Sequence, residues 1–130
     1  MTSKSPVVDD DDWITLSGDN TKGTSTMYVD CTTKNLNVKP NTKYSLIVEY
    51  KECTGDDSVS LYIVDYLNNG GQFNNIQNIP IKAIKSNSAK KSKFIITTRT
   101  DLTNLVAGLR TYMDVPAGTK GSITFRLSVL

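Results

Sequence analysis

The chain has 130 residues, of which 38% are hydrophobic and 22% are charged, with a net charge of +2 and no histidine. This length fits one domain, which can bury one hydrophobic core without help from a metal or a disulfide framework. The near-neutral charge gives no reason to expect nucleic acid as a partner, and no apolar run approaches the roughly 18 residues that a membrane-spanning helix needs.

The first segment, residues 1–12, mixes Ser, Lys and Pro with four consecutive aspartates. Its low hydrophobicity and its like charges predict a flexible, unpaired acidic tail. The aspartates could supply oxygen ligands to calcium, but a disordered tail is the favoured interpretation. The segment lacks the apolar core of a signal peptide, so we expect the protein either to stay in the producing cell or to reach a virion or an extracellular surface within a larger assembly. A third possibility is that the sequence is an excised domain.

From residue 13 the sequence consists of short β-rich runs that are separated by residues typical of turns. Apolar side chains recur at every second position in these runs, as they do in strands with one buried face. The clearest example is residues 43–52, where Tyr44, Leu46, Val48 and Tyr50 are predicted to share the inner face. The predicted strands, in chain order, are residues 13–17, 25–31, 43–52, 58–66, 93–99, 106–115 and 122–130.

Two stretches between these runs have no clear periodicity. Residues 72–80 are Asn-rich and are predicted to be irregular, and residues 82–92 are polar and basic. The basic stretch could attract an acidic polymer such as a teichoic acid or a nucleic acid, but it lacks the interleaved aromatic residues that stack on bases. We interpret it as a mobile, solvated loop that carries Lys82, Lys85, Lys90 and Lys91, with Lys93 directly after it.

Seven or eight strands at regular spacing, with no alternation of strands and helices, predict an all-β domain. We therefore predict one two-sheet antiparallel β-sandwich with jelly-roll topology over residues 13–130. Cys31 and Cys53 lie on consecutive strands, where simple pairing around Pro40 and Asn41 would not place them opposite each other. Free, mostly buried thiols are the favoured prediction for both.

Two segments carry a resemblance to a known family. Residues 37–46 read Asn-Val-Lys-Pro-Asn-Thr-Lys-Tyr-Ser-Leu, and residues 115–127 read Val-Pro-Ala-Gly-Thr-Lys-Gly-Ser-Ile-Thr-Phe-Arg-Leu. They resemble a proline turn with its strand, and the last turn and strand, of carbohydrate-binding-module-like jelly rolls. Such jelly rolls occur as accessory domains of tail and other minor structural proteins of phages and prophages. The resemblance implies a module that docks on a polysaccharide or forms an assembly surface, with structural calcium as an open expectation and no other cofactor.

Catalytic chemistry finds little support in the sequence. Without histidine, neither cysteine has the usual partner for acyl transfer, and a zinc site would have only two sulfur ligands. A pair of outward carboxylates could hydrolyse glycosides, but solvated strand charges are the favoured interpretation. The candidates for such a pair are Asp30, Glu49, Asp65 and Asp114. We expect no enzyme and no catalytic metal.

Outward aromatic residues are the most informative binding candidates. The alternation places Trp13, Tyr28, Tyr62, Tyr66 and Tyr112 on the outer side of their strands, where they could also simply pack across neighbouring strands. A sugar ring presents apolar C–H faces to an aromatic ring, while its hydroxyls need polar partners. We predict that the ligand-binding residues are Tyr112, Arg110 and Arg126 in one groove or concave sheet, with Tyr28 or Tyr62 as a second platform.

These observations favour a non-catalytic binding module of a phage or prophage structural protein that contacts carbohydrate on the host surface. The alternative is a purely structural domain for virion assembly or decoration, with no glycan ligand. Its partners would be other virion proteins or further copies of this chain. Neither nucleic acid nor a membrane is an expected partner.

Overall fold

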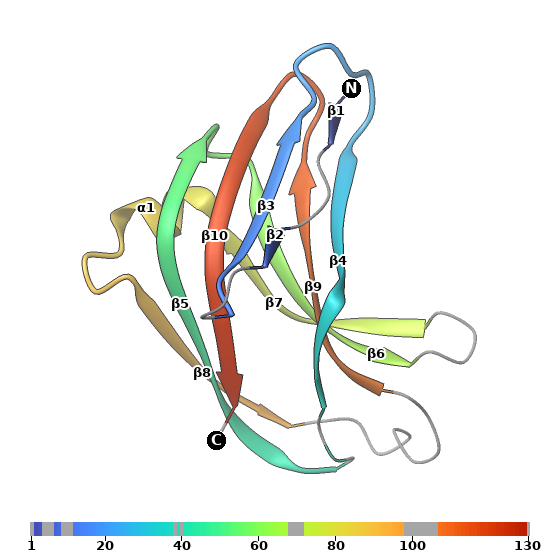
Figure 1. Ribbon diagram of the computed structural model, residues 1–130, viewed down its shortest axis with the longest axis vertical. Helices are drawn as coiled ribbons and strands as arrows, with labels where there is room; N and C mark the ends of the chain where they lie inside the picture. The colour runs from blue at the N-terminus through green and yellow to red at the C-terminus, as the bar shows by residue number, and fades with distance from the viewer. Residues whose placement is uncertain are drawn as a thin grey trace.

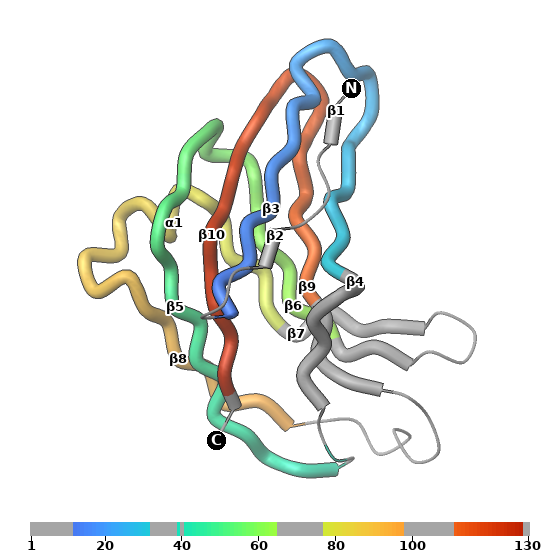
Figure 2. Tube along the Cα trace, viewed as in Figure 1, coloured from blue at the N-terminus to red at the C-terminus, as the bar shows by residue number. Residues whose placement is uncertain are grey.

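The computed structural model describes residues 2–3, 7–8, 12–37, 39, 41–67, 72–97 and 107–129, with the side chains of residues 12–31, 39, 41–64, 77–97 and 111–128 (Figure 2). Ten strands and one short helix follow one another along these residues. Their bounds are β1 (Thr2–Ser3), β2 (Val7–Val8), β3 (Ile14–Asp19), β4 (Met27–Asn37), β5 (Lys43–Gly55), β6 (Ser60–Leu67), β7 (Gln72–Pro80), α1 (Ile81–Ser86), β8 (Lys91–Thr97), β9 (Ala107–Val115) and β10 (Lys120–Val129).

The strands form two antiparallel sheets, one in front of the other in Figure 1. Sheet A has the order β1-β3-β10-β5-β8, with β2 also paired to β3, and sheet B has the order β4-β9-β6-β7. When the eight longer strands are numbered along the chain from β3 to β10, sheet A runs 1-8-3-6 and sheet B runs 2-7-4-5. This is the strand order of a jelly roll, which is built from two Greek keys. The predicted all-β sandwich with jelly-roll topology is confirmed.

The core lies between the sheets and is filled by the side chains that the alternation predicts. Leu46, Val48 and Tyr50 of β5 are buried, and so are Ile123 and Phe125 of the neighbouring β10. Burial of an aliphatic or aromatic side chain of this size contributes about 1.5–3 kcal/mol. These inward residues fix which side of each strand faces solvent, and therefore which residues each outer face of the sandwich presents.

A buried asparagine joins the two sheets at the end where β3 leads into β4. Asn20 is completely buried, and its Nδ2 donates hydrogen bonds to the carbonyl oxygens of Ser25 (2.8 Å) and Val115 (2.9 Å). The backbone carbonyl oxygen of Asn20 accepts hydrogen bonds from the backbone N–H groups of Gly23 and Gly118. A Cβ at Gly23 would lie 1.7 Å from Asn20 Oδ1, so that position requires glycine. Asn20 thus ties the β3–β4 loop to the turn between β9 and β10.

Two segments pair where the sequence predicts no strand. Residues 1–12 are predicted to be an unpaired tail, but Thr2–Ser3 and Val7–Val8 each pair with β3; residues 1, 4–6 and 9–11 lie outside the described residues. The Asn-rich residues 72–80, predicted to be irregular, form β7 along the edge of sheet B. The segment itself has weak periodicity, so its extended conformation follows from backbone pairing with β6 rather than from its own side-chain pattern.

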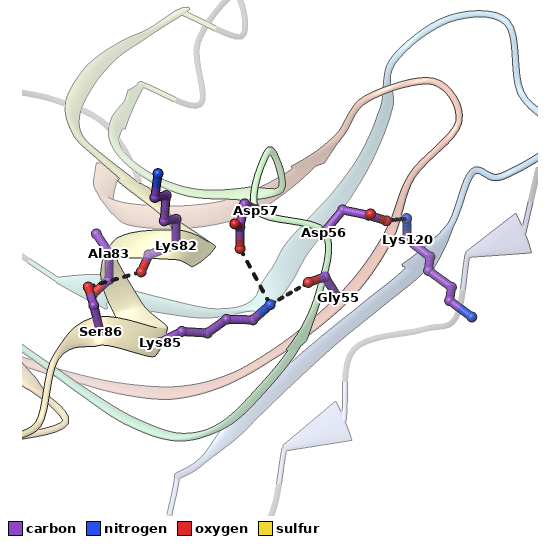
Figure 3. Close-up of polar contacts among 8 residues, drawn as sticks. All are labelled: Gly55, Asp56, Asp57, Lys82, Ala83, Lys85, Ser86 and Lys120. Atoms are coloured by element: carbon purple, nitrogen blue, oxygen red, sulfur yellow. Dashed lines mark hydrogen bonds and ion pairs between the residues drawn. The ribbon is translucent and has the colours of Figure 1, made fainter.

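The basic stretch at residues 82–92 is not the predicted solvated loop. Its first part belongs to α1, whose two isoleucines are buried in the core. Figure 3 shows Lys85 reaching from α1 to the carbonyl oxygen of Gly55 and to the carboxylate of Asp57, the latter at 3.5 Å. After the helix, the Asn87 side chain bonds to backbone groups of the turn that leads into β8. The stretch is therefore held in place by its contacts with the core and with β5.

The cysteines are free, as predicted. Cys31 lies in β4 of sheet B and Cys53 lies in β5 of sheet A, because the chain crosses from one sheet to the other between them. Cys31 is fully buried, and burial raises the pKa of the half-buried Cys53 thiol. A raised thiol pKa leaves little thiolate at neutral pH, so Cys53 is a poor nucleophile.

Candidate functional site

The register of sheet B brings three tyrosines from three adjacent strands onto its outer face. Tyr62 of β6 lies directly opposite Tyr112 of β9. Tyr28 of β4 lies opposite Asp114, two residues along β9 from Tyr112. In each strand the residues on both sides of the tyrosine are buried in the core, so the three rings project outward. We call Tyr28, Tyr62 and Tyr112 the tyrosine platform.

The three rings contact one another. Tyr62 and Tyr112 stack with their centroids 4.9 Å apart and their planes 2° from parallel, and Tyr28 meets Tyr112 edge to face at 5.8 Å and 72°. Because neighbouring strands lie about 4.8 Å apart, the stacking follows from the opposed register of the two residues. Each such pair contributes about 0.5–1.5 kcal/mol beyond burial, so the rings hold one another in place. Tyr28 remains 64% exposed.

Asp114 lies beside the platform with an unsatisfied acceptor. Its Oδ1 is buried and has no hydrogen-bond partner among the described residues. Burial raises the pKa of Asp114 above its ordinary value of 3.8. Burial also raises the pKa of Tyr112, and the nearby Tyr62, Asp114 and Tyr28 add to that rise. An unpaired buried acceptor lowers stability. Asn20 Oδ1 and Thr111 Oγ1 are also without a partner among the described residues, so Asp114 is distinguished by its position next to three outward rings.

Further polar groups surround the rings. Asp30 of β4 lies opposite Tyr112, and Asn78 of β7 donates a hydrogen bond from Nδ2 to Tyr62 Oη at 3.3 Å. Asp30 and Asp114 are diagonal neighbours on β4 and β9, a relation that places residues about 7 Å apart in antiparallel sheets. The face therefore combines aromatic rings with amide, hydroxyl and carboxylate groups, as recognition of a sugar ring requires.

The structure brings together only part of the predicted site. Tyr28 and Tyr62 share one face with Tyr112, as predicted. Arg110 lies in β9 two residues before Tyr112, but its side chain is outside the described residues. The prediction that Arg126 shares this face is wrong, because β10 pairs between β3 and β5 in sheet A. Alternation shows which side of a strand faces out, but not which sheet the strand joins.

Arg126 lies instead on the outer face of sheet A. Its Nε and Nη2 each donate to a carboxylate oxygen of Glu49 at 3.2 Å, and its guanidinium carbon lies 4.5 Å from the centre of the Trp13 ring. Lys51 Nζ approaches the same ring at 5.2 Å. These contacts give Trp13 and Glu49 a structural role, because they fasten the start of β3 to β10 and β5. The remaining carboxylate candidate, Asp65, has its side chain outside the described residues.

Two of the turn aspartates also have structural roles. Asp19 accepts hydrogen bonds from the hydroxyl (2.6 Å) and the backbone N–H (3.0 Å) of Thr21, which lower its pKa. Asp56 accepts a hydrogen bond from the backbone N–H of Lys120, as Figure 3 shows. Both close turns at the same end of sheet A, a role that aspartate side chains often have in turns.

Metal and membrane sites receive no support from the described part of the chain. There, no group of three or more Cys, Asp or Glu side chains is placed to hold a metal ion. No helix in those residues is long and apolar enough to cross a membrane. Residues 9–11 of the aspartate run lie outside the described residues, so structural calcium stays a prediction.

Sequence reasoning missed Asn78. The Asn-rich segment around it was predicted to be irregular, so none of its side chains was assigned to a face. A weak signal was present, because the buried Ile79 and Ile81 alternate with Asn78 and Pro80. Read as a strand, this alternation places Asn78 on the outer face, where it lies opposite Tyr62.

No protein-family model matches the sequence, and no curated protein matches it either. Similar solved structures include a xylan-binding module of family 15, with 11% identity over 95% of this chain and 84% of that one and a TM-score of 0.46. They also include a family 16 carbohydrate-binding module (11% identity, 91% and 75% coverage, TM-score 0.44) and a family 29 module (7%, 96% and 77%, 0.41). At such identities and TM-scores, neither a ligand nor a binding residue transfers to this chain.

Proposed function

We propose that this chain is a non-catalytic carbohydrate-binding module and that the tyrosine platform is its binding face. The observation that carries the proposal is the mutual contact of three outward tyrosines beside the partly buried carboxyl group of Asp114. The rings can cover the apolar C–H face of a sugar, and the part of the carboxyl group that is not buried can accept hydrogen bonds from its hydroxyls. Both parts of this chemistry lie on the same sheet face.

The ring geometry defines how a sugar would bind. A ligand held between two rings needs a separation of about 7–8 Å, twice the carbon–carbon contact distance. Tyr62 and Tyr112 are only 4.9 Å apart, so the sugar lies over the platform rather than between these rings. Tyr28, which is the most exposed of the three, makes the first contact. Each stacking or hydrogen-bonding contact contributes about 1 kcal/mol net, which implies micromolar or weaker affinity for one copy.

We propose binding without catalysis because the neighbouring carboxyl groups, Asp30 and Asp114, lie on an outer strand face. Hydrolysis of a glycoside needs one carboxylic acid and one carboxylate on either side of the scissile bond, in a site that excludes bulk water. Asp30 is exposed on the strand face beside Asp114. A sugar bound on this open face keeps its water, which favours binding without hydrolysis.

We further propose that the module belongs to a phage or prophage structural protein, on a virion or an extracellular surface, and contacts carbohydrate of the host. The resemblance of residues 37–46 and 115–127 to accessory jelly rolls of such proteins supports this setting. Weak single contacts also suit a particle with many copies, because linked contacts raise avidity by orders of magnitude. In the alternative, an assembly domain, the exposed Tyr28 would contact another virion protein.

A matched pair of variants tests the site. Tyr28→Ala and Ile95→Ala each remove an exposed large side chain, 64% and 60% exposed, from opposite faces of the sandwich. We would titrate wild type and both variants with xylan, glucan, mannan and N-acetylglucosamine oligosaccharides and with soluble host-wall polysaccharide, by calorimetry. Trp13 fluorescence is unsuitable for this purpose, because Trp13 lies on sheet A.

We expect at least one glycan to bind wild type, with affinity reduced about 5-fold or more by Tyr28→Ala and nearly unchanged by Ile95→Ala. Equal losses in both variants would place the binding elsewhere. Absence of binding to every glycan, together with self-association in ultracentrifugation, would favour the assembly domain. Release of reducing ends from a bound glycan would contradict the non-catalytic assignment.

A further inference from the structure

Positive charge is concentrated in one part of the sequence. Residues 66–100 contain six of the fifteen Lys and Arg residues and none of the thirteen Asp and Glu residues. Within this segment, β8 forms one edge of the path of sheet A and turns Lys91 and Lys93 outward, because Ser92, Phe94 and Ile96 face the core side. Two of the six cations, Lys91 and Lys93, therefore lie on the outer face of sheet A, and Lys82, Lys85 and Lys90 lie on α1 and the turn after it.

The outer face of sheet A gathers cations from three adjacent strands, β8, β5 and β10. Lys91 lies opposite Glu49, which in turn lies opposite Arg126, so the three residues form a row across the face. The lysines of the face are all exposed. We call the following residues the basic face: Lys43, Lys51, Lys91, Lys93 and Arg126.

The carboxylates described near this charge are unevenly placed. Glu49 is engaged by Arg126, and Glu52 is exposed at the bulge of β5. Asp12 and Asp19 are exposed on the β3 side, where Asp19 lies opposite Lys120, and β8 itself carries none. On the outer face of sheet B, the charged side chains that are described are both acidic, Asp30 and Asp114. The described parts of the two outer faces therefore differ in charge.

We infer that the basic face is a second binding surface, for an acidic polysaccharide, that is, a sugar chain with carboxylate or phosphate groups. The cations are spread over three strands about 4.8 Å apart, which suits an extended polyanion better than a small ion. Lysine ammonium groups are mobile point charges and recognise charge rather than a fixed planar group. This inference does not depend on the tyrosine platform.

Two other polyanionic partners fit the face less well. Single-stranded nucleic acid binds through aromatic rings that stack on bases, but Trp13, the aromatic side chain described on this outer face, is already covered by Arg126 and Lys51. Attachment to an anionic membrane is strengthened by apolar side chains that enter the lipid, and Ile95 is the large hydrophobic residue described as exposed here. A sugar chain needs neither feature.

The test uses two double variants of equal charge. Lys91→Gln with Lys93→Gln changes the basic face, and Lys22→Gln with Lys82→Gln removes two exposed charges from the β3–β4 loop and from α1. The probes are sodium polygalacturonate for carboxylate, poly(glycerol phosphate) for phosphate and neutral dextran as the uncharged control. Trp13 fluorescence is the signal, because the ring lies within the face, and melting curves confirm that each variant is folded.

We expect wild type to bind one or both polyanions but not dextran, with affinity that falls as salt rises. The Lys91/Lys93 variant should lose about 5-fold or more in affinity and show a shallower salt dependence, while the Lys22/Lys82 variant changes less than about 2-fold. Equal losses in the two variants would show that only net charge matters and would overturn the inference. So would failure to bind either polyanion at low salt, or tighter binding to single-stranded DNA or to phosphatidylglycerol vesicles. None of these outcomes tests the proposed sugar binding by the tyrosine platform, because these four lysines lie outside it.

Discussion

The two outer faces of the sandwich are built on the same strand alternation, yet their charged side chains differ in whether neighbouring groups bind them. On sheet A, Arg126 is paired with Glu49 and packed on Trp13, so that cluster is satisfied by its own neighbours. On sheet B, the tyrosines contact one another, but Asp114 retains a buried oxygen without a partner among the described residues. The sheet A cluster stabilises the fold, whereas the outward rings of sheet B, with the exposed Tyr28 and the partly buried Asp114, offer a surface for a ligand.

The first prediction tests whether the two faces belong to one folding unit. Asn20→Ala removes a buried hydrogen bond to the Val115 carbonyl at the end of β9 and a part-buried one to the Ser25 carbonyl in the β3–β4 loop, and it leaves both carbonyl groups unsatisfied. We expect the free energy of unfolding to fall by about 2–4 kcal/mol. In urea, Trp13 fluorescence reports sheet A, and the NMR amide signals of Tyr28, Tyr62 and Tyr112 report sheet B. The two transitions should coincide in wild type and variant; separate transitions would mean that the sheets unfold independently.

The second prediction concerns the stacked pair. Tyr112→Ala removes the ring that both other platform rings contact, so we expect a loss of about 1–3 kcal/mol in unfolding free energy and loss of sugar binding. Tyr62→Phe keeps the ring and removes only the hydrogen bond from Asn78, so it should cost less than about 0.5 kcal/mol. Chemical denaturation measures both. Similar costs for the two variants would show that the stacking contributes little.

The third prediction concerns the satisfied cluster. Glu49→Gln removes the negative charge of the partly exposed side chain that pairs with Arg126. We expect it to lower the free energy of unfolding by up to about 1 kcal/mol, and by a smaller amount at high salt. The same change makes the basic face more positive, so affinity for polygalacturonate should rise. Thermal melts at low and high salt, with a titration of the polyanion, check both effects. An unfolding free energy that salt does not alter would argue against an electrostatic contribution.

The fourth prediction concerns Asp114 on sheet B, where we expect a small increase in the free energy of unfolding rather than a decrease. Asp114→Asn removes a charge that lacks a partner, so it should raise stability at neutral pH by a few tenths up to about 1 kcal/mol and weaken sugar binding. Because the folded-state pKa lies above 3.8, the carboxyl favours folding below that pH and loses this contribution as pH rises through the raised pKa. The advantage of the variant should therefore disappear below about pH 3.8. A variant that is less stable at neutral pH would mean that the carboxylate has a partner.

The sequence predicted the fold class and the inward side chains because buried strands impose a period of two, as in residues 43–52. It also placed Tyr28, Tyr62 and Tyr112 outward. It could not predict that Arg126 lies on the opposite sheet from Tyr112, because sheet membership depends on long-range pairing. For the same reason it missed β7 and, with it, Asn78, since the pairing with β6 rather than local preference makes that segment a strand.

Mapping of a bound glycan by heteronuclear NMR tests the proposed function most directly. Wild-type protein would be titrated with the tightest-binding oligosaccharide while backbone amide and tyrosine ring signals are followed. We predict that the largest shifts fall on Tyr28, Tyr112 and Asp114, with Tyr62 and Asn78 next, and that signals of β8 and the start of β3 stay unchanged. Shifts confined to sheet A, or none with any glycan, would contradict the assignment of the tyrosine platform as the sugar-binding face.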